Sequence, residues 1–326
     1  MLRLPPFRYL APRTLDEAAH MLAQEGEAAM LVAGGTDLYP NMKRRQFTPP
    51  VLIGLRNLPE LKFLTGSPAS GLRIGSGVTL TTLAEHPLVR EHYPALATAA
   101  GLVSTPQLRN AGTIGGNLLL DTRCNYYNQT EFWRNAIGYC MKRDGDICLV
   151  APGSPRCWAI SSADTAPVLV SLGASVRLFS ARGERVLPVR ELFNDDGMRP
   201  YTKAADEILS EIILPPVLGW RSVYLKLRRR GSFDFPMLGV AVALRQSEDG
   251  LVEDARITLG AVASHPVEAS AAAARLIGQR LTPPLLAEVA ALAAKPARPL
   301  DNADLSMSYR KQVTTTYVRR ALDQLM

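Results

Sequence analysis

The sequence predicts an α+β protein in which two small α/β units precede a smaller α+β C-terminal domain. Three observations carry this prediction. The first 58 residues run through strand, glycine turn, helix and strand, an order typical of an α/β unit. The proline pair Pro215-Pro216 marks a linker before the last third of the chain. At 326 residues the chain is also too long for one simple core, so we expect domains at 1–58, 59–216 and 217–326.

The first unit contains a recognisable helix start. Thr14 and Glu17 form a capping box, in which a hydroxyl and a carboxylate three residues apart satisfy free backbone N–H groups, and this predicts a helix over 15–25. The apolar run 29–33 predicts a buried strand, followed by a glycine turn and a second short helix. Residues 51–53 predict the next strand.

The pattern in the remaining two units is similar in kind. In the second unit we expect a strand at 72–75, helix over most of 79–102 with a break near Pro94, regular structure at 166–170, and strands at 174–178 and 185–187. In the C-terminal unit we expect strands at 222–227, 238–244 and 255–262 and helices at 267–277, 284–293 and 304–325.

Composition argues against nucleic-acid and membrane partners. The net charge of +7 is modest, and the densest basic run, 228–230, follows an apolar alternating segment, as a solvated strand end does. The first twelve residues lack the apolar core of a signal peptide, and no apolar run approaches the roughly 18 residues of a membrane helix. We therefore expect a cytoplasmic protein.

Two glycine turns follow predicted strands. Gly34-Gly35-Thr36 offers successive backbone N–H groups without side chains in the way, which suits a diphosphate, and 113–117 is a second such loop. Each of them alone is more often only a simple turn. Gly75-Ser76-Gly77 begins like a dinucleotide fingerprint, but Leu80 stands where the third glycine belongs, so we interpret it as a strand-end turn.

All four cysteines of the chain fall in one short window. They are Cys124, Cys140, Cys148 and Cys157, separated by fifteen, seven and eight residues. No Cys-x-x-Cys occurs, so the ligand pair of most structural zinc sites is absent. Four soft thiolates are a natural ligand set for a [4Fe–4S] cluster. The spacing alone leaves three possibilities open: an iron–sulfur cluster, zinc, and cysteines that are unligated or paired in disulfides.

No constellation for acid–base or nucleophilic catalysis is visible. The four histidines are dispersed and none has metal-ligand spacing to another histidine or to a cysteine. A protein with a candidate redox centre, phosphate-binding turns and no catalytic cluster is typical of an electron carrier whose chemistry resides in its cofactors.

Three motifs together carry a resemblance to a known family. The segments Leu31–Leu38 (LVAGGTDL), Thr113–Asn117 (TIGGN) and Asp164–Pro167 (DTAP) resemble, in order, those of the flavin-binding subunits of the xanthine dehydrogenase (molybdenum hydroxylase) family. The resemblance covers essentially the whole chain. It implies a PCMH-type FAD-binding fold of two α/β subdomains, followed by the smaller α+β domain.

The resemblance also implies the FAD site. The two glycine loops would bind the diphosphate and adenosine portion, the segment 103–112 would border the cofactor, and Asp164 and Lys226 would approach the flavin. The residues expected to bind FAD are Leu31, Val32, Ala33, Gly34, Gly35, Thr36, Asp37, Leu38, Val103, Leu108, Gly112, Thr113, Gly115, Gly116, Asn117, Asp164 and Lys226.

The chain departs from most of the family in one place. About forty residues, at about 120–160, lie between the TIGGN loop and Asp164, and they hold every cysteine. We expect this insert to have no helix or strand of its own. It resembles the loop that carries a [4Fe–4S] cluster in the β subunits of the 4-hydroxybenzoyl-CoA reductases, a branch of the family. The resemblance implies that all four cysteines ligate one such cluster.

Partners follow from the same resemblance. It implies a large molybdopterin subunit that holds the substrate, a small subunit with two [2Fe–2S] clusters, a dimer of heterotrimers, and reduced ferredoxin as the electron donor. The function that the resemblance implies is an FAD- and [4Fe–4S]-binding electron-transfer subunit of a 4-hydroxybenzoyl-CoA reductase, which removes the phenolic hydroxyl and gives benzoyl-CoA. The first alternative is an aldehyde or N-heterocycle oxidoreductase of the same family, which passes electrons outward. The alternative from another class is a zinc-stabilised ligand-binding protein without redox activity.

Overall fold

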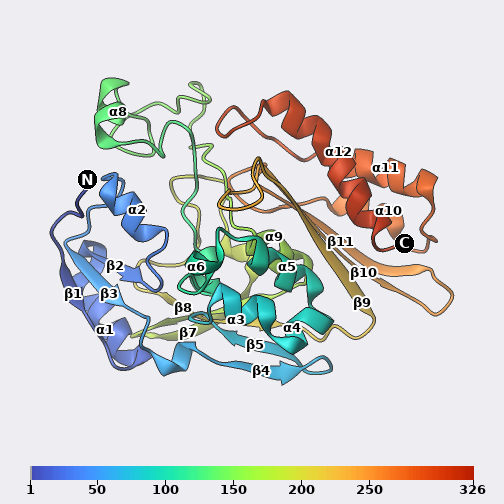
Figure 1. Ribbon diagram of the computed structural model, residues 1–326, viewed down its shortest axis with the longest axis horizontal. Coiled ribbons are helices and arrows are strands. Elements are labelled where there is room, and N and C mark those ends of the chain that lie inside the picture. Colours follow the sequence, from blue (N-terminus) through green and yellow to red (C-terminus); the bar gives the residue numbers. More distant parts are fainter. Residues whose placement is uncertain (1) are drawn as a thin grey trace.

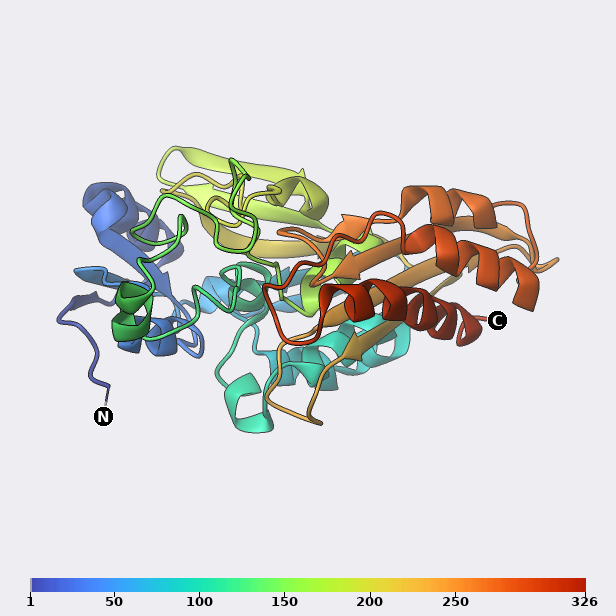
Figure 2. The ribbon, with the colours of Figure 1, turned by 90° about the horizontal axis from the view of Figure 1, so that it is seen from above.

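Three β-sheets organise the chain, and the computed structural model describes residues 2–326. The first sheet is parallel with the order β1-β3-β2, the second is antiparallel with the order β4-β5-β8-β6-β7, and the third is antiparallel with the order β12-β11-β10-β9. Seen from above, the three units follow one another along the long axis of the molecule, with the N-terminal and C-terminal units at opposite ends (Figure 2).

The N-terminal unit forms largely as predicted. Its elements are β1 (Arg8–Leu10), α1 (Leu15–Glu25), the 3₁₀ turn η1 (Gly26–Ala28), β2 (Ala29–Val32), α2 (Leu38–Lys43) and β3 (Val51–Gly54). The Thr14 hydroxyl accepts the N–H of Glu17 at 3.1 Å, as the capping box requires. The predicted burial of β2 is only partly correct: β2 is an edge strand with one fully buried residue, whereas the central strand β3 is buried throughout.

The second unit packs a layer of short helices on the five-stranded sheet. Its elements are η2 (Pro59–Leu61), β4 (Leu64–Ser67), β5 (Gly71–Gly75), α3 (Leu80–Glu85), α4 (Pro87–His92), α5 (Pro94–Leu102), α6 (Pro106–Arg109), α7 (Ile114–Leu118), α9 (Thr165–Ser171), β6 (Ser175–Ser180), β7 (Gly183–Pro188), η3 (Val189–Leu192) and β8 (Ile208–Leu214). The helical stretch 80–102 breaks at two prolines rather than one, because Pro87 and Pro94 each begin a new helix.

The insert contains a helix, so the expectation that it has no regular structure is wrong. Helix α8 (Glu131–Ala136) begins at Thr130, whose hydroxyl accepts the N–H of Trp133 at 3.3 Å. An ion pair between Glu131 and Arg134 supports this single short turn. Six residues are too few to show helical periodicity in the sequence. The insert rises from the centre of the molecule and places α8 above α2 (Figure 1).

The C-terminal unit is a sheet between two helical layers. Its elements are β9 (Trp220–Leu227), β10 (Leu238–Gln246), β11 (Val252–Gly260), β12 (Val267–Glu268), α10 (Ser270–Leu276), α11 (Pro283–Ala293) and α12 (Met307–Asp323). Helices α10 and α12 pack on one face, and α5 and α9 of the second unit pack on the other. Alternate residues of β10 therefore enter two different cores. The helix expected over 267–277 starts three residues late because Val267 first pairs with Leu259 of β11.

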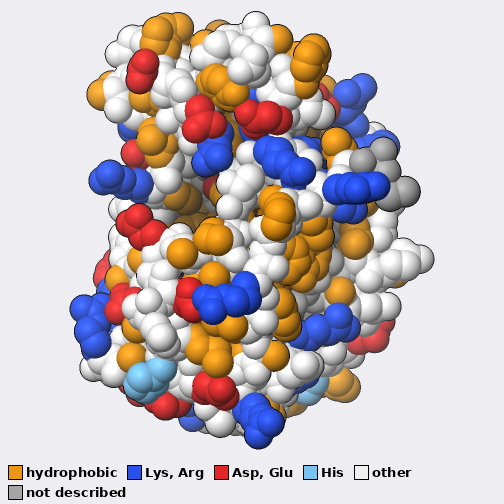
Figure 3. All heavy atoms as spheres, turned by 90° about the vertical axis from the view of Figure 1, so that its left-hand side faces the viewer, with side chains coloured by type: hydrophobic (Ala, Val, Ile, Leu, Met, Phe, Trp, Pro, Cys, Tyr) orange, Lys and Arg blue, Asp and Glu red, His pale blue; other side chains and the backbone are white. Residues whose placement is uncertain are grey.

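The surface carries charges of both signs. On the face shown in Figure 3, Lys and Arg side chains are interspersed with Asp and Glu. Within the predicted basic strand end, Arg229 and Arg230 form exposed ion pairs with Asp304 and Asp234. Between residues 2 and 326, no helix has the length and apolar character needed to cross a membrane.

Candidate functional site

The first glycine turn can be built only from glycines. It joins the end of β2 to the start of α2. A Cβ on Gly34 would lie 2.0 Å from the backbone oxygen of Ala111, and a Cβ on Gly35 would lie 2.2 Å from the ring of Tyr39. Gly35 also has a φ of +69°, which side chains disfavour. The turn thus packs directly on a neighbouring backbone and leaves its own N–H groups unobstructed by side chains.

The second glycine loop is the first turn of a helix rather than a loose turn. The Thr113 hydroxyl caps α7 by accepting the N–H of Gly116 at 3.1 Å. A Cβ on Gly115 would lie 2.6 Å from the Cβ of Ser76, so this glycine also permits a close approach. The side-chain oxygen of Asn117 accepts the N–H of Thr165 at 3.2 Å and its hydroxyl at 2.6 Å. The loop is therefore fixed to α9 as well.

A cavity of about 290 Å³ lies between the two glycine loops. It is lined by all the predicted residues of both loops and of the segment between 103 and 112, namely Leu31, Val32, Ala33, Gly34, Gly35, Thr36, Asp37, Leu38, Val103, Leu108, Gly112, Thr113, Gly115, Gly116 and Asn117. The structure thus brings together fifteen residues that are more than seventy positions apart at their extremes.

Several other lining residues were not predicted from the sequence. Ser76 and Gly77, from the turn that we dismissed as a strand end, face the cavity, and Gly77 would place a Cβ 2.9 Å from the backbone oxygen of Leu61. Ile208 and Leu209 reach the cavity from β8. The two glycines of 75–77 were the available signal, but they serve close packing on Leu61 rather than a dinucleotide fingerprint.

A second cavity, of about 670 Å³, continues from the first and leads toward the cysteines. Thr36, Asp37, Val103 and Asn117 belong to the walls of both. The walls also hold buried polar atoms without a hydrogen-bond partner among residues 2–326: Asn41 Oδ1, Asp121 Oδ2 and Ser162 Oγ. Unpaired buried polar atoms are costly, so they fit a polar ligand. The glycine cradles, the two adjoining cavities and the unpaired polar atoms in their walls together fit FAD, and we refer to the two cavities together as the flavin cavity.

Asp164 lines the second cavity and belongs to a buried network. Its carboxylate accepts hydrogen bonds from Tyr224 at 2.8 Å and from the Lys226 ammonium at 2.9 Å. Burial raises the pKa of Asp164 and lowers the pKa of Lys226, while their attraction opposes both shifts. The Lys226 side chain is 1% exposed, so it is not a solvated strand residue. It lies outside both cavity walls and also donates to the Leu102 carbonyl at 3.0 Å, so it can act on a ligand through Asp164.

Arg123 lines the second cavity next to Cys124. Its guanidinium lies 3.7 Å from the carboxylate of Asp37 and 3.8 Å from the ring centroid of Phe235, which lines both cavities. Burial lowers the pKa of Arg123, and the charge of Asp37 opposes this shift. The backbone at Arg123 is paired with that at Ile160, because the two residues exchange two backbone hydrogen bonds of 2.9 and 2.8 Å.

The four cysteines are buried free thiols. Cys124, Cys140 and Cys157 pack in one cluster with Tyr127 and Ala159, and Cys124 also lines the second cavity. Burial raises the pKa of Cys124 to about 12 and the pKa of Cys157 to about 11. The four thiols are thus unpaired in the structure, and three of them lie in one buried cluster.

The four thiols are suitable metal ligands by their chemistry, but they do not lie at the spacing of metal ligands. Within residues 2–326, no group of three or more His, Cys, Asp or Glu side chains is close enough to hold a metal ion. The donors are nevertheless the right kind for iron–sulfur, and the backbone N–H of Ala159 points at the sulfur of Cys157 at 3.4 Å, a contact typical of cluster sulfurs. We conclude that the residues fit a cluster, in an arrangement looser than a bound metal requires.

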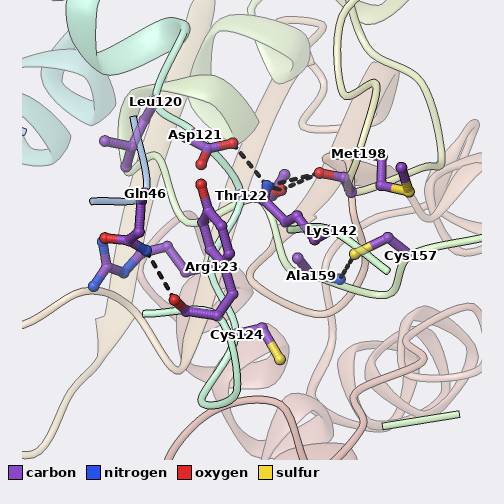
Figure 4. A network of polar contacts seen from close by, with 12 residues as sticks. Gln46, Leu120, Asp121, Thr122, Arg123, Cys124, Lys142, Cys157, Ala159 and Met198 are labelled. Atoms are coloured by element: carbon purple, nitrogen blue, oxygen red, sulfur yellow. Dashed lines mark hydrogen bonds and ion pairs between the residues drawn. The ribbon is translucent and has the colours of Figure 1, made fainter. Parts of the chain in front are cut away.

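Lys142 fixes the base of the insert, as Figure 4 shows. Its ammonium donates to Asp121 Oδ1 at 2.7 Å, to the Gly197 carbonyl at 2.7 Å and to the Thr122 hydroxyl. Gly197 in turn donates its N–H to the carbonyl of Cys157 at 2.9 Å. A buried cation therefore joins the start of the insert to the segment that holds its last cysteine.

Comparison with known proteins agrees with this geometry. Residues 5–217 match the family described as the FAD binding domain in molybdopterin dehydrogenase, and residues 222–325 match the CO dehydrogenase flavoprotein C-terminal domain. The aldehyde oxidoreductase FAD-binding subunit PaoB of Escherichia coli (strain K12) is 34% identical over 83% of this chain and 86% of its own. The nicotinate dehydrogenase FAD-subunit of Eubacterium barkeri is 29% identical over 85% and 81%.

A solved structure confirms the predicted fold class. Carbon monoxide dehydrogenase from Hydrogenophaga pseudoflava superposes with a TM-score of 0.80 at 29% identity, over 98% of this chain and 97% of that one. The FAD-binding fold followed by a smaller C-terminal domain, expected from the sequence, is therefore correct.

Proposed function

Because this chain belongs to the family of FAD-binding subunits of the molybdenum hydroxylases, we propose that it is an electron-transfer subunit that carries one [4Fe–4S] cluster beside its FAD. FAD, once bound, supplies a group that exchanges electrons with redox partners. The chain's own residues would cradle its diphosphate with Gly34, Gly35 and the α7 N-terminus, and would place Asp164 on the wall of the adjoining cavity.

The single observation that supports the cluster is that all four cysteines lie buried and free in one segment that borders the flavin cavity. Four thiols without any Cys-x-x-Cys suit an iron–sulfur core better than a structural zinc site. Ordering an insert of about forty residues costs conformational entropy, and a cluster would offset this cost with four covalent anchors.

The test is a metal analysis of the full chain, purified without oxygen, together with its absorption spectrum. We expect FAD and about four irons per chain, with a flavin plus iron–sulfur spectrum. Zinc in place of iron would instead support the zinc-stabilised alternative. A chain purified in this way that holds flavin and no metal of either kind would contradict both metal hypotheses.

We further propose the assembly that the family implies. The curated relatives include the medium chain of a carbon monoxide dehydrogenase and the medium subunit of a nicotine 6-hydroxylase, so large and small partner subunits belong to this type of complex. For this chain we propose a molybdopterin-containing large subunit, a small subunit with two [2Fe–2S] clusters, a dimer of heterotrimers, and ferredoxin as the donor. Mass measurement of the purified complex tests the composition.

We expect another subunit to bind the substrate, and two hypotheses for the reaction of the complex compete. The cysteine insert supports a 4-hydroxybenzoyl-CoA reductase, in which electrons from ferredoxin reduce 4-hydroxybenzoyl-CoA to benzoyl-CoA. The relatives named for aldehyde and nicotinate oxidation support an aldehyde or N-heterocycle oxidoreductase that passes electrons outward. Assays of the whole complex with reduced ferredoxin plus 4-hydroxybenzoyl-CoA, and with an aromatic aldehyde plus an electron acceptor, separate the two. The isolated chain should turn over neither.

A further inference from the structure

One residue of the C-terminal unit, Asn302, joins the two ends of the cysteine segment. The backbone carbonyl of Asn302 accepts the N–H of Asn125 at 2.9 Å, and its side-chain amide donates to the carbonyl of Trp158 at 2.6 Å. Asn125 directly follows Cys124, and Trp158 directly follows Cys157. Asn302 thus holds the peptide units next to the first and the last cysteine.

Asn302 is itself fixed by a buried cation. Arg310 of α12 is fully buried and donates to the side-chain oxygen of Asn302 at 3.3 Å and to the Leu300 carbonyl at 2.9 Å. It also donates to the carbonyls of Met237 at 3.1 Å and Ala261. Because these bonds use all of its nitrogens and orient the Asn302 amide, the donor toward Trp158 has one defined direction.

Other contacts hold the same two segments, 123–125 and 157–160, which we call the stems of the insert. Near Asn302 the two stems are paired by the backbone hydrogen bonds between Arg123 and Ile160. The Ser264 hydroxyl, also from the C-terminal unit, lies 3.4 Å from the carbonyl of Cys157. The separation of Cys124 and Cys157 is thus set by the backbone pairing of Arg123 with Ile160 and by contacts from the C-terminal unit, among which Asn302 contacts both sides.

We propose that Asn302 is a positioning residue for the [4Fe–4S] cluster, which holds Cys124 and Cys157 at the separation that the cluster needs, with Arg310 orienting its amide. This inference rests on the proposed function, because it presupposes the cluster. Groups that orient metal ligands without touching the metal are commonly worth roughly 10- to 100-fold in metal affinity.

The test compares Asn302→Asp and Asn302→Ala with the wild-type chain, each loaded with iron and FAD. Asp keeps the size, the backbone carbonyl for Asn125 and an oxygen for Arg310, but replaces the donor to Trp158 with an acceptor. In both variants we expect roughly 10- to 100-fold easier iron loss to a chelator, an altered cluster EPR spectrum and a shifted cluster potential. Gln246→Ala is the matched control, since it removes an amide donor to the Gly250 carbonyl, at 3.1 Å, elsewhere in the same unit.

Each alternative outcome is distinct. A wild-type chain that holds no iron would overturn the cluster and the positioning role together. A wild-type chain with iron, beside an Asn302→Asp variant with unchanged iron retention, spectrum and potential, would overturn the positioning role alone. Lower unfolding stability with those three readouts unchanged would mean that Asn302 only stabilises the fold. If Asn302→Ala does not fold, Asn302→Asp decides the question, because it preserves the packing.

Discussion

The flavin cavity and the cysteine insert lie side by side but are built in different ways. The cavity is made mainly by backbone at the ends of regular elements, and its glycines fit where a Cβ would collide with other residues. The insert has one short helix and is held mostly by side chains that donate to backbone carbonyls, such as Gln46, Arg134 and Lys142. The first site is fixed by the fold, whereas the second depends on individual tethers.

The two sites therefore differ in how far the fold alone positions their residues. Strands and helix termini position the cavity walls. The thiols gather without reaching the spacing of metal ligands. Metal binding and local ordering are coupled where ligands come from irregular chain. Flavin loading and metal loading should therefore respond to different substitutions, and the predictions that follow test this separation.

The largest effect is expected from replacing a cysteine. Cys→Ser at Cys124, Cys140, Cys148 or Cys157 should abolish cluster binding and leave FAD bound, because the flavin cavity does not depend on the insert for its glycine walls. Iron and flavin analysis of each variant checks this. Gly153→Ala, at an open position of the insert, is the control and should keep both groups. A serine variant with full iron content would remove that cysteine from the ligand set.

The converse variant is Gly35→Val, which should lose FAD and keep iron. The new Cβ would collide with the ring of Tyr39, and the left-handed φ would cost about 1–3 kcal/mol for a residue other than glycine. Flavin content after gel filtration measures the effect. Gly101→Ala is the matched control, since its Cβ would meet only Ala84 at 3.8 Å. Full FAD content in the valine variant would show that the diphosphate is bound elsewhere.

The flavin cavity and the cysteine insert also differ in how well the sequence predicts them. The glycine loops and the segment 103–112 were predicted residue by residue, because loop and helix-terminus motifs are local and keep their order. Most regular elements around them were also predicted. The short edge strands β1, β4 and β12 were missed because they have too few residues for a period of two to show. The central strand β8 was missed because it is buried on both faces and so shows no alternation of apolar and polar residues.

What the sequence could not show were the contacts between distant segments. The approach of Ser76 and Gly77 to the cavity depends on β5 pairing with β8, and the bridge from Asn302 to the insert joins residues more than 140 positions apart. The sequence did not predict helix α8, because the N-cap residue Thr130 is followed by a helix of only six residues. Such features arise from tertiary packing, which no local pattern encodes.

A smaller effect is expected at the buried pair of Asp164 and Lys226. Lys226→Met leaves a buried carboxylate without its cation, which typically destabilises a protein by about 3–5 kcal/mol. Urea unfolding measures this, and the flavin potential should shift as well, because Asp164 borders the cavity. Arg275→Met breaks a pair with Glu288 that is about half exposed and should cost at most about 1 kcal/mol. Equal losses in the two variants would contradict the importance of the buried pair.

The smallest effect concerns acid and the wall of the flavin cavity. Glu207 precedes Ile208 and Leu209 of that wall and accepts two hydrogen bonds from Arg185, at 2.6 and 2.9 Å. These bonds hold the pKa of Glu207 below its usual value, although burial opposes the shift. A carboxyl whose pKa is lower in the folded than in the unfolded state stabilises the fold above its unfolded pKa of about 4.3, and this stabilisation is lost as pH falls through the folded value.

Glu207→Gln should therefore reduce stability at neutral pH by up to about 1 kcal/mol and flatten the loss of stability on acidification below about pH 4.3. Urea unfolding and FAD release, both followed from neutral pH into acid, measure the effect, with the exposed Glu248→Gln as control. Because the cavity is fixed by the fold, FAD release should track unfolding in both chains. FAD release well before unfolding in the wild-type chain would mean that the cavity, like the insert, depends on individual tethers, and the contrast between the two regions would fail.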